Sequence, residues 1–155
     1  MWLGYHAIMI YLATDHRGFA LKEKIKTWLT EWDMEFVDCG NTKEDPNDDY
    51  TDFVAQAATK VAEDPLNNRG IVLGHSGQGE AMVANRRRGV RAAVLYALNE
   101  DIVKLSREHN AANVLSLGAS FLSDDEAKRA IKLWLETPFS DEERHIRRIG
   151  KIDSQ

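Results

Sequence analysis

The stretch Gly70–Asn85, with the sequence GIVLGHSGQGEAMVAN, decides the fold class of this chain. Its small and apolar residues Ile71–Gly74 predict a buried strand, and Ala81–Asn85 has the composition of a helix. The glycine-rich segment between them predicts a tight turn. A strand that passes through such a turn into a helix is the repeating unit of an α/β sheet.

The turn His75–Glu80 also carries groups that can do chemistry, the Ser76 hydroxyl and the Glu80 carboxylate. Free backbone N–H groups at the start of a helix favour an anion at this point. A carboxylate beside such a turn suits proton abstraction next to a carbonyl, because negative charge then develops on oxygen. From this segment alone, an equally good interpretation is an ordinary turn in which the glutamate belongs to the first helical turn and has no chemical role.

The same alternation extends outward along the chain. Strand-like segments occupy residues 8–13, 35–39, 71–74, 90–95 and 114–117, and helical patterns separate them. In the helix expected at 99–109, Ile102, Leu105 and Ser106 should face the core, and Ser123 predicts the start of a last helix over 124–136. These patterns predict a single doubly wound, Rossmann-like domain, a three-layer α/β/α fold with a five-stranded parallel sheet.

Composition fits one globular domain, because the chain has 155 residues of which 43% are hydrophobic and 29% charged. We expect the domain to span residues 9–150, with an N-terminal extension over 1–8 and a C-terminal tail over 151–155. Residues 1–8 lack the pattern of a signal peptide, and Met1 and Met9 are both candidate starts. A net charge of −5 with mixed signs predicts no nucleic-acid partner, and the lack of a long apolar stretch predicts no membrane span.

Several common site chemistries find no support in the sequence. The single cysteine, Cys39, excludes an intrachain disulfide and a multi-cysteine zinc site, and it fits a cytoplasmic location. No two histidines have the i, i+4 spacing, so no metal site is expected. The glycines of Gly77–Gly79 lack the third glycine of a dinucleotide fingerprint, and no phosphate-binding Gly-Lys-Ser/Thr sequence occurs.

Polar residues gather at three turns of the predicted fold. Asp15-His16 follows the first strand, His75–Glu80 follows the third, and His109-Asn110 ends the fourth helix. Doubly wound folds bind ligands at the carboxyl ends of their strands, so these three turns are expected to converge on that rim. Taken singly, Asp15-His16 also fits a helix-entry turn, and His109-Asn110 fits a helix C-cap.

The chain resembles a known family, the type B ribose-5-phosphate isomerases, which also include galactose-6-phosphate isomerase subunits. The similar segments occur in the family's order and span nearly all of residues 9–150. They are Thr14–Phe19, Asp49–Phe53, Gly77–Asn85, Gly89–Ala93, Arg107–Leu115 and Arg144–Arg148.

The resemblance implies a homodimer, or a dimer of dimers, with active sites built from both subunits and a sugar phosphate as substrate. The implied reaction is the aldose–ketose isomerisation of ribose 5-phosphate to ribulose 5-phosphate through a cis-enediolate, with no metal and no organic cofactor. Many relatives place a cysteine base at the position of Gly74. A second subgroup instead uses the glutamate of Ser-Gly-x-Gly-Glu, which is Glu80 here.

The resemblance also assigns roles to the remaining candidates. Glu80 is expected as the base and His109 as the group that assists ring opening. Three residues, Ser76, Gly77 and Gly79, are expected to stabilise the enediolate oxygen, with Asp15 at a substrate hydroxyl and Asn110 near the developing charge. The phosphate is expected at His16, Arg144, His145 and Arg148. Alternatively, the basic C-terminal cluster is a helix that pairs with acids such as Glu142 and Glu143.

One departure from the family concerns the substrate. Many relatives follow the fifth strand with Gly-x-Arg, whose arginine reaches the phosphate, whereas this chain has Gly118-Ala119-Ser120. The missing cation implies a weaker affinity for phosphate, another arginine in its place, or a substrate other than ribose 5-phosphate. The alternative substrates are a six-carbon sugar phosphate and an unphosphorylated aldose, and a catalytically silent protein that binds a sugar phosphate is a separate alternative.

Overall fold

The computed structural model describes residues 8–155, so the expected N-terminal extension lies outside the described residues except for Ile8. Five parallel strands form one sheet in the order β2-β1-β3-β5-β4. The strands are β1 (Met9–Thr14), β2 (Phe36–Asp38), β3 (Asn68–Gly74), β4 (Ala92–Leu95) and β5 (Val114–Gly118). The predicted five-stranded parallel sheet is confirmed.

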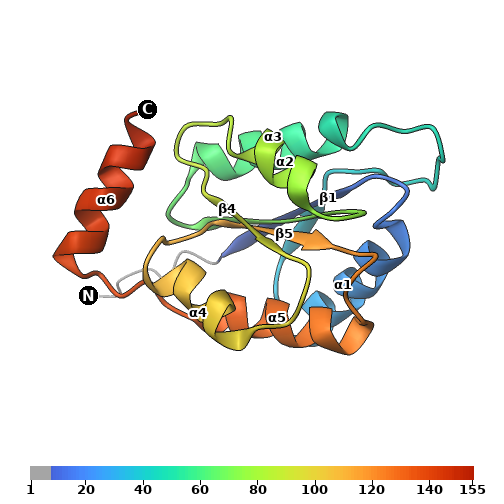
Figure 1. Cartoon of the computed structure of the whole chain (residues 1–155). Coiled ribbons are helices and arrows are strands. Elements are labelled where there is room, and N and C mark those ends of the chain that lie inside the picture. Colours follow the sequence, from blue (N-terminus) through green and yellow to red (C-terminus); the bar gives the residue numbers. More distant parts are fainter. Residues whose placement is uncertain (1–7) are drawn as a thin grey trace.

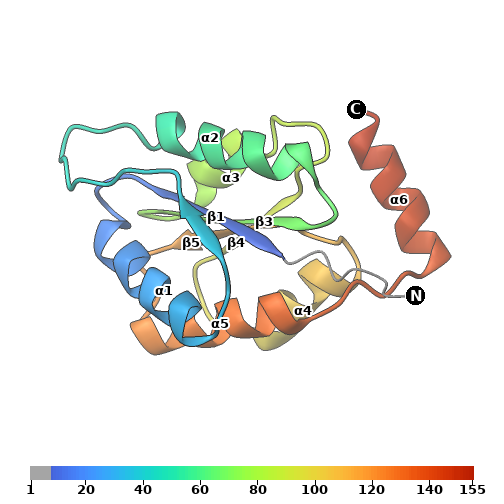
Figure 2. The same cartoon turned by 180° about the vertical axis from the view of Figure 1, so that it is seen from behind.

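Six helices accompany the sheet in the described part of the chain. They are α1 (Phe19–Glu31), α2 (Tyr50–Glu63), α3 (Gln78–Ala84), α4 (Glu100–Glu108), α5 (Asp124–Glu136) and α6 (Glu143–Asp153). Helices α2 and α3 cover one face of the sheet, and α1, α4 and α5 cover the other (Figures 1 and 2). The predicted three-layer arrangement is therefore confirmed, and it separates two hydrophobic clusters, one on each face of the sheet.

Successive residues of β3 alternate between these two clusters. Ile71 and Leu73 pack with α1 and α5, whereas Val72 packs with α2. This is the period of a strand buried on both faces, and it explains why the segment reads as a continuous apolar run. The next residue in the alternation, Gly74, faces the side of α3, where the turn after the strand returns.

The fourth strand is shorter than the pattern predicts, because it begins at Ala92 instead of Val90. The backbone N–H of Val90 donates to the carbonyl of Arg87 at 3.0 Å, and the N–H of Arg91 donates to the Asn113 side chain at 2.8 Å. These two residues therefore form the entry turn, not the ladder.

The buried face of α4 also differs from the prediction. Ile102 is 52% exposed and Leu105 is 38% exposed, whereas Val103 and Arg107 are buried. The Arg107 guanidinium occupies the inner face because it donates to the carbonyl of Ala112 at 2.7 Å and to that of Thr137 at 3.1 Å. Burial lowers the pKa of Arg107 to about 10, so the side chain is still charged at neutral pH.

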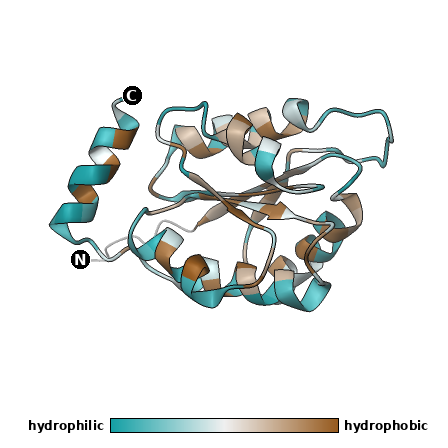
Figure 3. Cartoon of the chain, in the orientation of Figure 1, coloured by the Kyte–Doolittle hydropathy of each residue, from teal (hydrophilic) through white to brown (hydrophobic). Residues whose placement is uncertain are grey.

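The basic segment near the C-terminus forms the helix α6, which stands away from the layers on the side where the chain enters β1 (Figures 1 and 2). Arg144 pairs with Glu142 at 2.8 Å, as the helical alternative predicted. The helix continues through Asp153, whose carboxylate holds Arg91 at 2.8 Å. Much of α6 and of the long loop before α2 is hydrophilic (Figure 3). No described helix is both long and apolar enough to span a membrane.

Candidate active site

The carboxyl ends of β1 and β3 bring two acidic side chains together. Asp15 follows β1 and is 6% exposed, and Glu80 lies in the first turn of α3 and is 4% exposed. The backbone N–H of Arg17 donates to Asp15 Oδ1 at 2.9 Å. Neighbouring β1 and β3 send their chains to helices on opposite faces of the sheet, so this pair occupies the crevice where doubly wound folds bind ligands.

Gly74 makes the space that the Glu80 carboxylate occupies. A Cβ built on Gly74 would overlap Oε1 and the carboxyl carbon of Glu80. A side chain at position 74 and a glutamate carboxylate in this place therefore exclude each other. Gly74 therefore allows the Glu80 carboxylate to lie in this position.

The environment of Glu80 favours its neutral form. Burial raises the pKa of the Glu80 carboxyl above its ordinary value, and the nearby charge of Asp15 raises it further, against a hydrogen bond from its own backbone. A carboxylate whose proton affinity is raised by burial is a stronger base when it is ionised. The raised pKa of Glu80 therefore makes it a candidate for a proton-transfer group.

The turn before Glu80 is held by contacts with β5. Gly77 has a φ of 79°, which favours glycine, and its carbonyl accepts a hydrogen bond from Ser116 Oγ at 2.5 Å. A Cβ at Gly79 would meet the Tyr50 hydroxyl, so this ring borders the turn. Ser76 Oγ accepts from the N–H of Gln78 at 3.4 Å. The structure thus brings Ser76, Gly77 and Gly79 together with Glu80.

His16 lies at the same edge of the sheet. Its Nδ1 is 2.7 Å from Asp48 Oδ1, and ligand atoms of Asp15, His16 and Asp48 all lie within 4.8 Å of one another. These three side chains are the group of described residues that could hold a metal ion. Asp48 Oδ1 is already occupied by the hydrogen bond from His16, so a hydrogen-bonded pair accounts for the arrangement.

The other predicted residues lie at the opposite edge, so the expectation that all three turns converge on one rim is wrong within one chain. Helix α4 begins at the carboxyl edge, runs back along the sheet and ends just before β5 begins. His109 and Asn110 follow its last turn and therefore lie at the amino edge, beside α6. There the His109 and His145 rings stack with their centroids 4.2 Å apart.

His145, one of the two stacked rings, is buried, with 3% of its surface exposed. Burial lowers the pKa of the His145 imidazole, and the neighbouring His109 and Arg144 lower it further. Among the described residues its Nε2 has no hydrogen-bond partner. Arg144 and Arg148 lie exposed on the same helix. A hollow of about 720 Å³ also lies on this side, lined by Asn110, Arg91 and Asp153 among others.

Three residues of the carboxyl edge, Tyr50, Asp48 and His75, have no role predicted from the sequence. Tyr50 lay within a segment shared with the family, which was a usable signal. Asp48 reaches His16 across 32 residues of sequence, so no local pattern indicated the contact. His75 Nδ1 is 2.7 Å from Ser120 Oγ, and its ring packs edge-on against Phe121 with the centroids 5.4 Å apart.

Comparison with known proteins gives a consistent result. The Ribose/Galactose Isomerase family matches residues 10–152. Ribose-5-phosphate isomerase B of Mycobacterium tuberculosis is 39% identical over 140 residues, which cover 90% of this chain and 85% of that protein.

Solved structures agree with the sequence comparison. The crystal structure of ribose-5-phosphate isomerase B from Mycoplasma genitalium with bound ribulose-5-phosphate has a TM-score of 0.90 and 37% identity, covering 96% of this chain and 97% of the other. The ribose 5-phosphate isomerase of Thermotoga maritima has a TM-score of 0.88 and 37% identity, covering 97% of this chain and 100% of the other. The chain therefore belongs to the ribose/galactose isomerase family, a family of aldose–ketose isomerases.

Proposed function

We propose that this protein interconverts ribose 5-phosphate and ribulose 5-phosphate, with Glu80 as the base. The observation that carries the proposal is the buried Glu80 carboxylate in the space left by Gly74, with a raised pKa and Asp15 beside it. The names and structures of the relatives support the choice of substrate, because the related M. genitalium structure holds ribulose-5-phosphate.

The reaction proceeds in two stages. In the first, the C1 hydroxyl loses its proton and the ring oxygen gains one as the C1–O bond of the ring breaks, with His109 as the shuttle. In the second, Glu80 removes the proton from C2 and returns it to C1, while the hydroxyl proton moves from O2 to O1. Ser76 and the N–H groups of Gly77 and Gly79 stabilise the enediolate oxygen between these steps, where each such donor contributes about 3 kcal/mol.

A complete site requires a second copy of the chain. Glu80 and His109 lie at opposite edges of one sheet, so a symmetric pair in which each carboxyl edge meets the partner's amino edge unites them. Edge strand β4 has no second neighbour in the described sheet, and large apolar side chains lie exposed around it. They are Met82, Tyr96, Ile102 and Leu105. Among the described residues, Nε2 of buried His145 has no hydrogen-bond partner, which also suits it to a phosphate oxygen of the substrate.

In this pairing His16 from one subunit faces Arg144, His145 and Arg148 from the other. Arginine guanidinium groups bind a phosphate dianion through paired hydrogen bonds, which suits this set to the phosphate end of the substrate. Asp15 binds a substrate hydroxyl, and Asn110 lies near the developing charge. A cytoplasmic location fits a sugar-phosphate enzyme with a single cysteine.

The test is the conversion of ribose 5-phosphate by the purified protein in D₂O, followed by NMR. We expect ribulose 5-phosphate that carries deuterium at C1, because a proton held by Glu80 exchanges with solvent. Folded protein that leaves ribose 5-phosphate unchanged would overturn the proposal.

A second candidate substrate is favoured by one observation. The hydroxyl of Ser120 is hydrogen-bonded to the ring of His75. Position 120, where many relatives carry an arginine, therefore presents a hydroxyl next to an imidazole. A six-carbon sugar phosphate or an unphosphorylated aldose is the alternative that this change supports. Parallel assays with ribose, ribose 5-phosphate and a hexose 6-phosphate distinguish these substrates. A protein that binds a sugar phosphate without turning it over would be the silent member of the family.

Gly74→Ala tests the place of the glutamate. The added methyl overlaps the Glu80 carboxylate and displaces it, and a displacement of about 1 Å at a reacting group can cost about 100-fold in rate. We therefore expect kcat to fall about 10- to 100-fold while the protein stays folded. Gly150→Ala, whose added Cβ meets nothing within 4 Å, is the matched control. Equal kcat for the two variants would contradict the placement of Glu80.

A further inference from the structure

The loop between β2 and α2 contributes an acidic side chain, Asp48, that the proposed mechanism does not use. Its side chain is only 5% exposed. Oδ1 accepts from the backbone N–H of His16 at 3.0 Å and lies 2.7 Å from His16 Nδ1, and Oδ2 accepts from Asn41 Nδ2 at 3.0 Å. One carboxylate thus holds both the backbone and the ring of His16.

These contacts determine the ionisation of Asp48. Burial alone would raise the pKa of the Asp48 carboxyl, but hydrogen bonds from His16 and Asn41 outweigh it, so the pKa lies below its ordinary value. The carboxylate is therefore ionised at neutral pH and can only accept hydrogen bonds. It follows that Nδ1 of His16 carries the hydrogen between them, and that Nε2 is the nitrogen left for a ligand.

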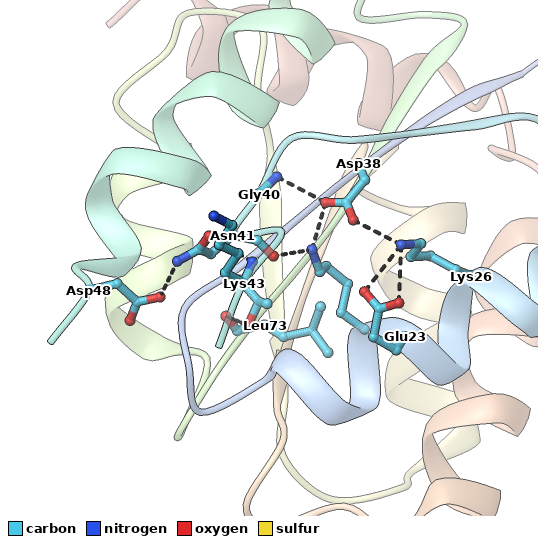
Figure 4. A network of polar contacts seen from close by, with 10 residues as sticks. Glu23, Lys26, Asp38, Gly40, Asn41, Lys43, Asp48 and Leu73 are labelled. Carbon is cyan, nitrogen blue, oxygen red and sulfur yellow. Dashed lines mark hydrogen bonds and ion pairs between the residues drawn. The ribbon is translucent and has the colours of Figure 1, made fainter. Parts of the chain in front are cut away.

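The carboxylate of Asp48 is held by a residue that is itself tied to β1 and α1. The side chain of Asn41 donates to Asp48, and its backbone N–H donates to the Thr14 carbonyl at 2.8 Å. Its own carbonyl accepts from Nζ of the fully buried Lys22 at 2.6 Å, and Lys22 also bonds Asp38 at 2.6 Å. Figure 4 shows this network, with Asp38, Asn41 and Asp48 labelled. A buried ion pair thus anchors the residues that hold His16.

We propose that Asp48 is the positioning residue of His16. It fixes the Nδ1–H tautomer and aims Nε2 at the phosphate group of the substrate. This inference rests on the proposed function for the identity of the substrate, while the tautomer of His16 is independent of it. The role resembles that of any carboxylate that orients a histidine through the far ring nitrogen.

Asp48→Asn tests the role by kinetics. The hydrogen bonds to His16 lose the charge of their acceptor while the volume of the side chain is kept, so we expect KM for ribose 5-phosphate to rise about 10- to 100-fold, with kcat changed less than about threefold. Asp45→Asn, an exposed acid in the same loop, is the matched control and should leave both constants unchanged. In a His16→Gln background, Asp48→Asn should have little further effect on KM, because Asp48 acts through His16.

The tautomer is measured directly by ¹⁵N–¹H NMR of the imidazole ring in the wild-type protein, which needs no turnover and no variant that folds. An Nδ1–H tautomer of His16 supports the proposal, and an Nε2–H tautomer overturns it. An unchanged KM in Asp48→Asn, with an active wild type, also overturns it and leaves the proposed function intact. An inert wild type with the Nδ1–H tautomer refutes the proposed function alone, and the hold of Asp48 on His16 stands.

Discussion

Replacing the carboxylate of Glu80 by an amide should remove nearly all turnover of ribose 5-phosphate. Glu80→Gln keeps the size of the side chain and loses its basicity, and general base catalysis typically contributes about 10²- to 10⁴-fold. We expect kcat to fall by that factor while KM changes little, because the proposed phosphate contacts do not involve Glu80. Spectrophotometric assay of ribulose 5-phosphate measures both constants.

The same variant should be more stable than the wild type at neutral pH. The pKa of Glu80 is raised in the folded protein, so the folded state binds its proton more tightly than the unfolded state. Stability from this group is therefore full below the unfolded value of about 4.3 and is lost as the pH rises through the folded pKa. Gln cannot ionise, so Tm of Glu80→Gln should exceed that of the wild type at pH 7, and the difference should vanish near pH 4.

Activity and stability together identify the cause of the loss. A variant that is inactive and more stable has lost a base, whereas one that is inactive and less stable has lost its fold. In the wild type, kcat/KM should fall as the pH drops through the raised pKa of Glu80, so the acid limb lies above the ordinary glutamate pKa. Retention of more than about a tenth of wild-type kcat in Glu80→Gln would contradict the role of Glu80.

The strand, turn and helix around Glu80 could be predicted from the sequence because their signals are local. An apolar run, two glycines and a helical composition follow one another within Gly70–Asn85, and each of these signals lies in neighbouring residues. Ser123 is a similar case, since its side chain and that of Glu126 form the capping box that starts α5. The order of the strands and the place of Gly74 against Glu80 needed the structure.

Features that depend on distant residues could not be predicted in this way. The predicted inner face of α4 is wrong because a charged residue, Arg107, lies on the buried face. Its guanidinium donates to two carbonyls that come later in the chain, and Ile102 and Leu105 lie on the exposed face. His109 was expected on the rim of Glu80 because motifs give no direction in space. The pairing of His16 with Asp48 depends on how the long loop folds back, for which the sequence carries no period.

The separation of Glu80 and His109 leads to the second large effect. If each active site takes Glu80 from one subunit and His109 from the other, two different inactive variants can complement each other. A heterodimer of Glu80→Gln with His109→Asn contains one site with both defects and one site with neither. The intact site should then work at its normal rate, because the two sites of a symmetric dimer are built from separate residues.

The measurement that tests the account most directly uses this heterodimer. The two chains are co-expressed with different affinity tags, and the mixed dimer is purified through both. Each parent dimer should retain about 1% of wild-type activity or less. The heterodimer should have about half of the wild-type activity, since one of its two sites is intact. A heterodimer as inactive as its parents, or a protein that is a monomer when active, would contradict the shared active site.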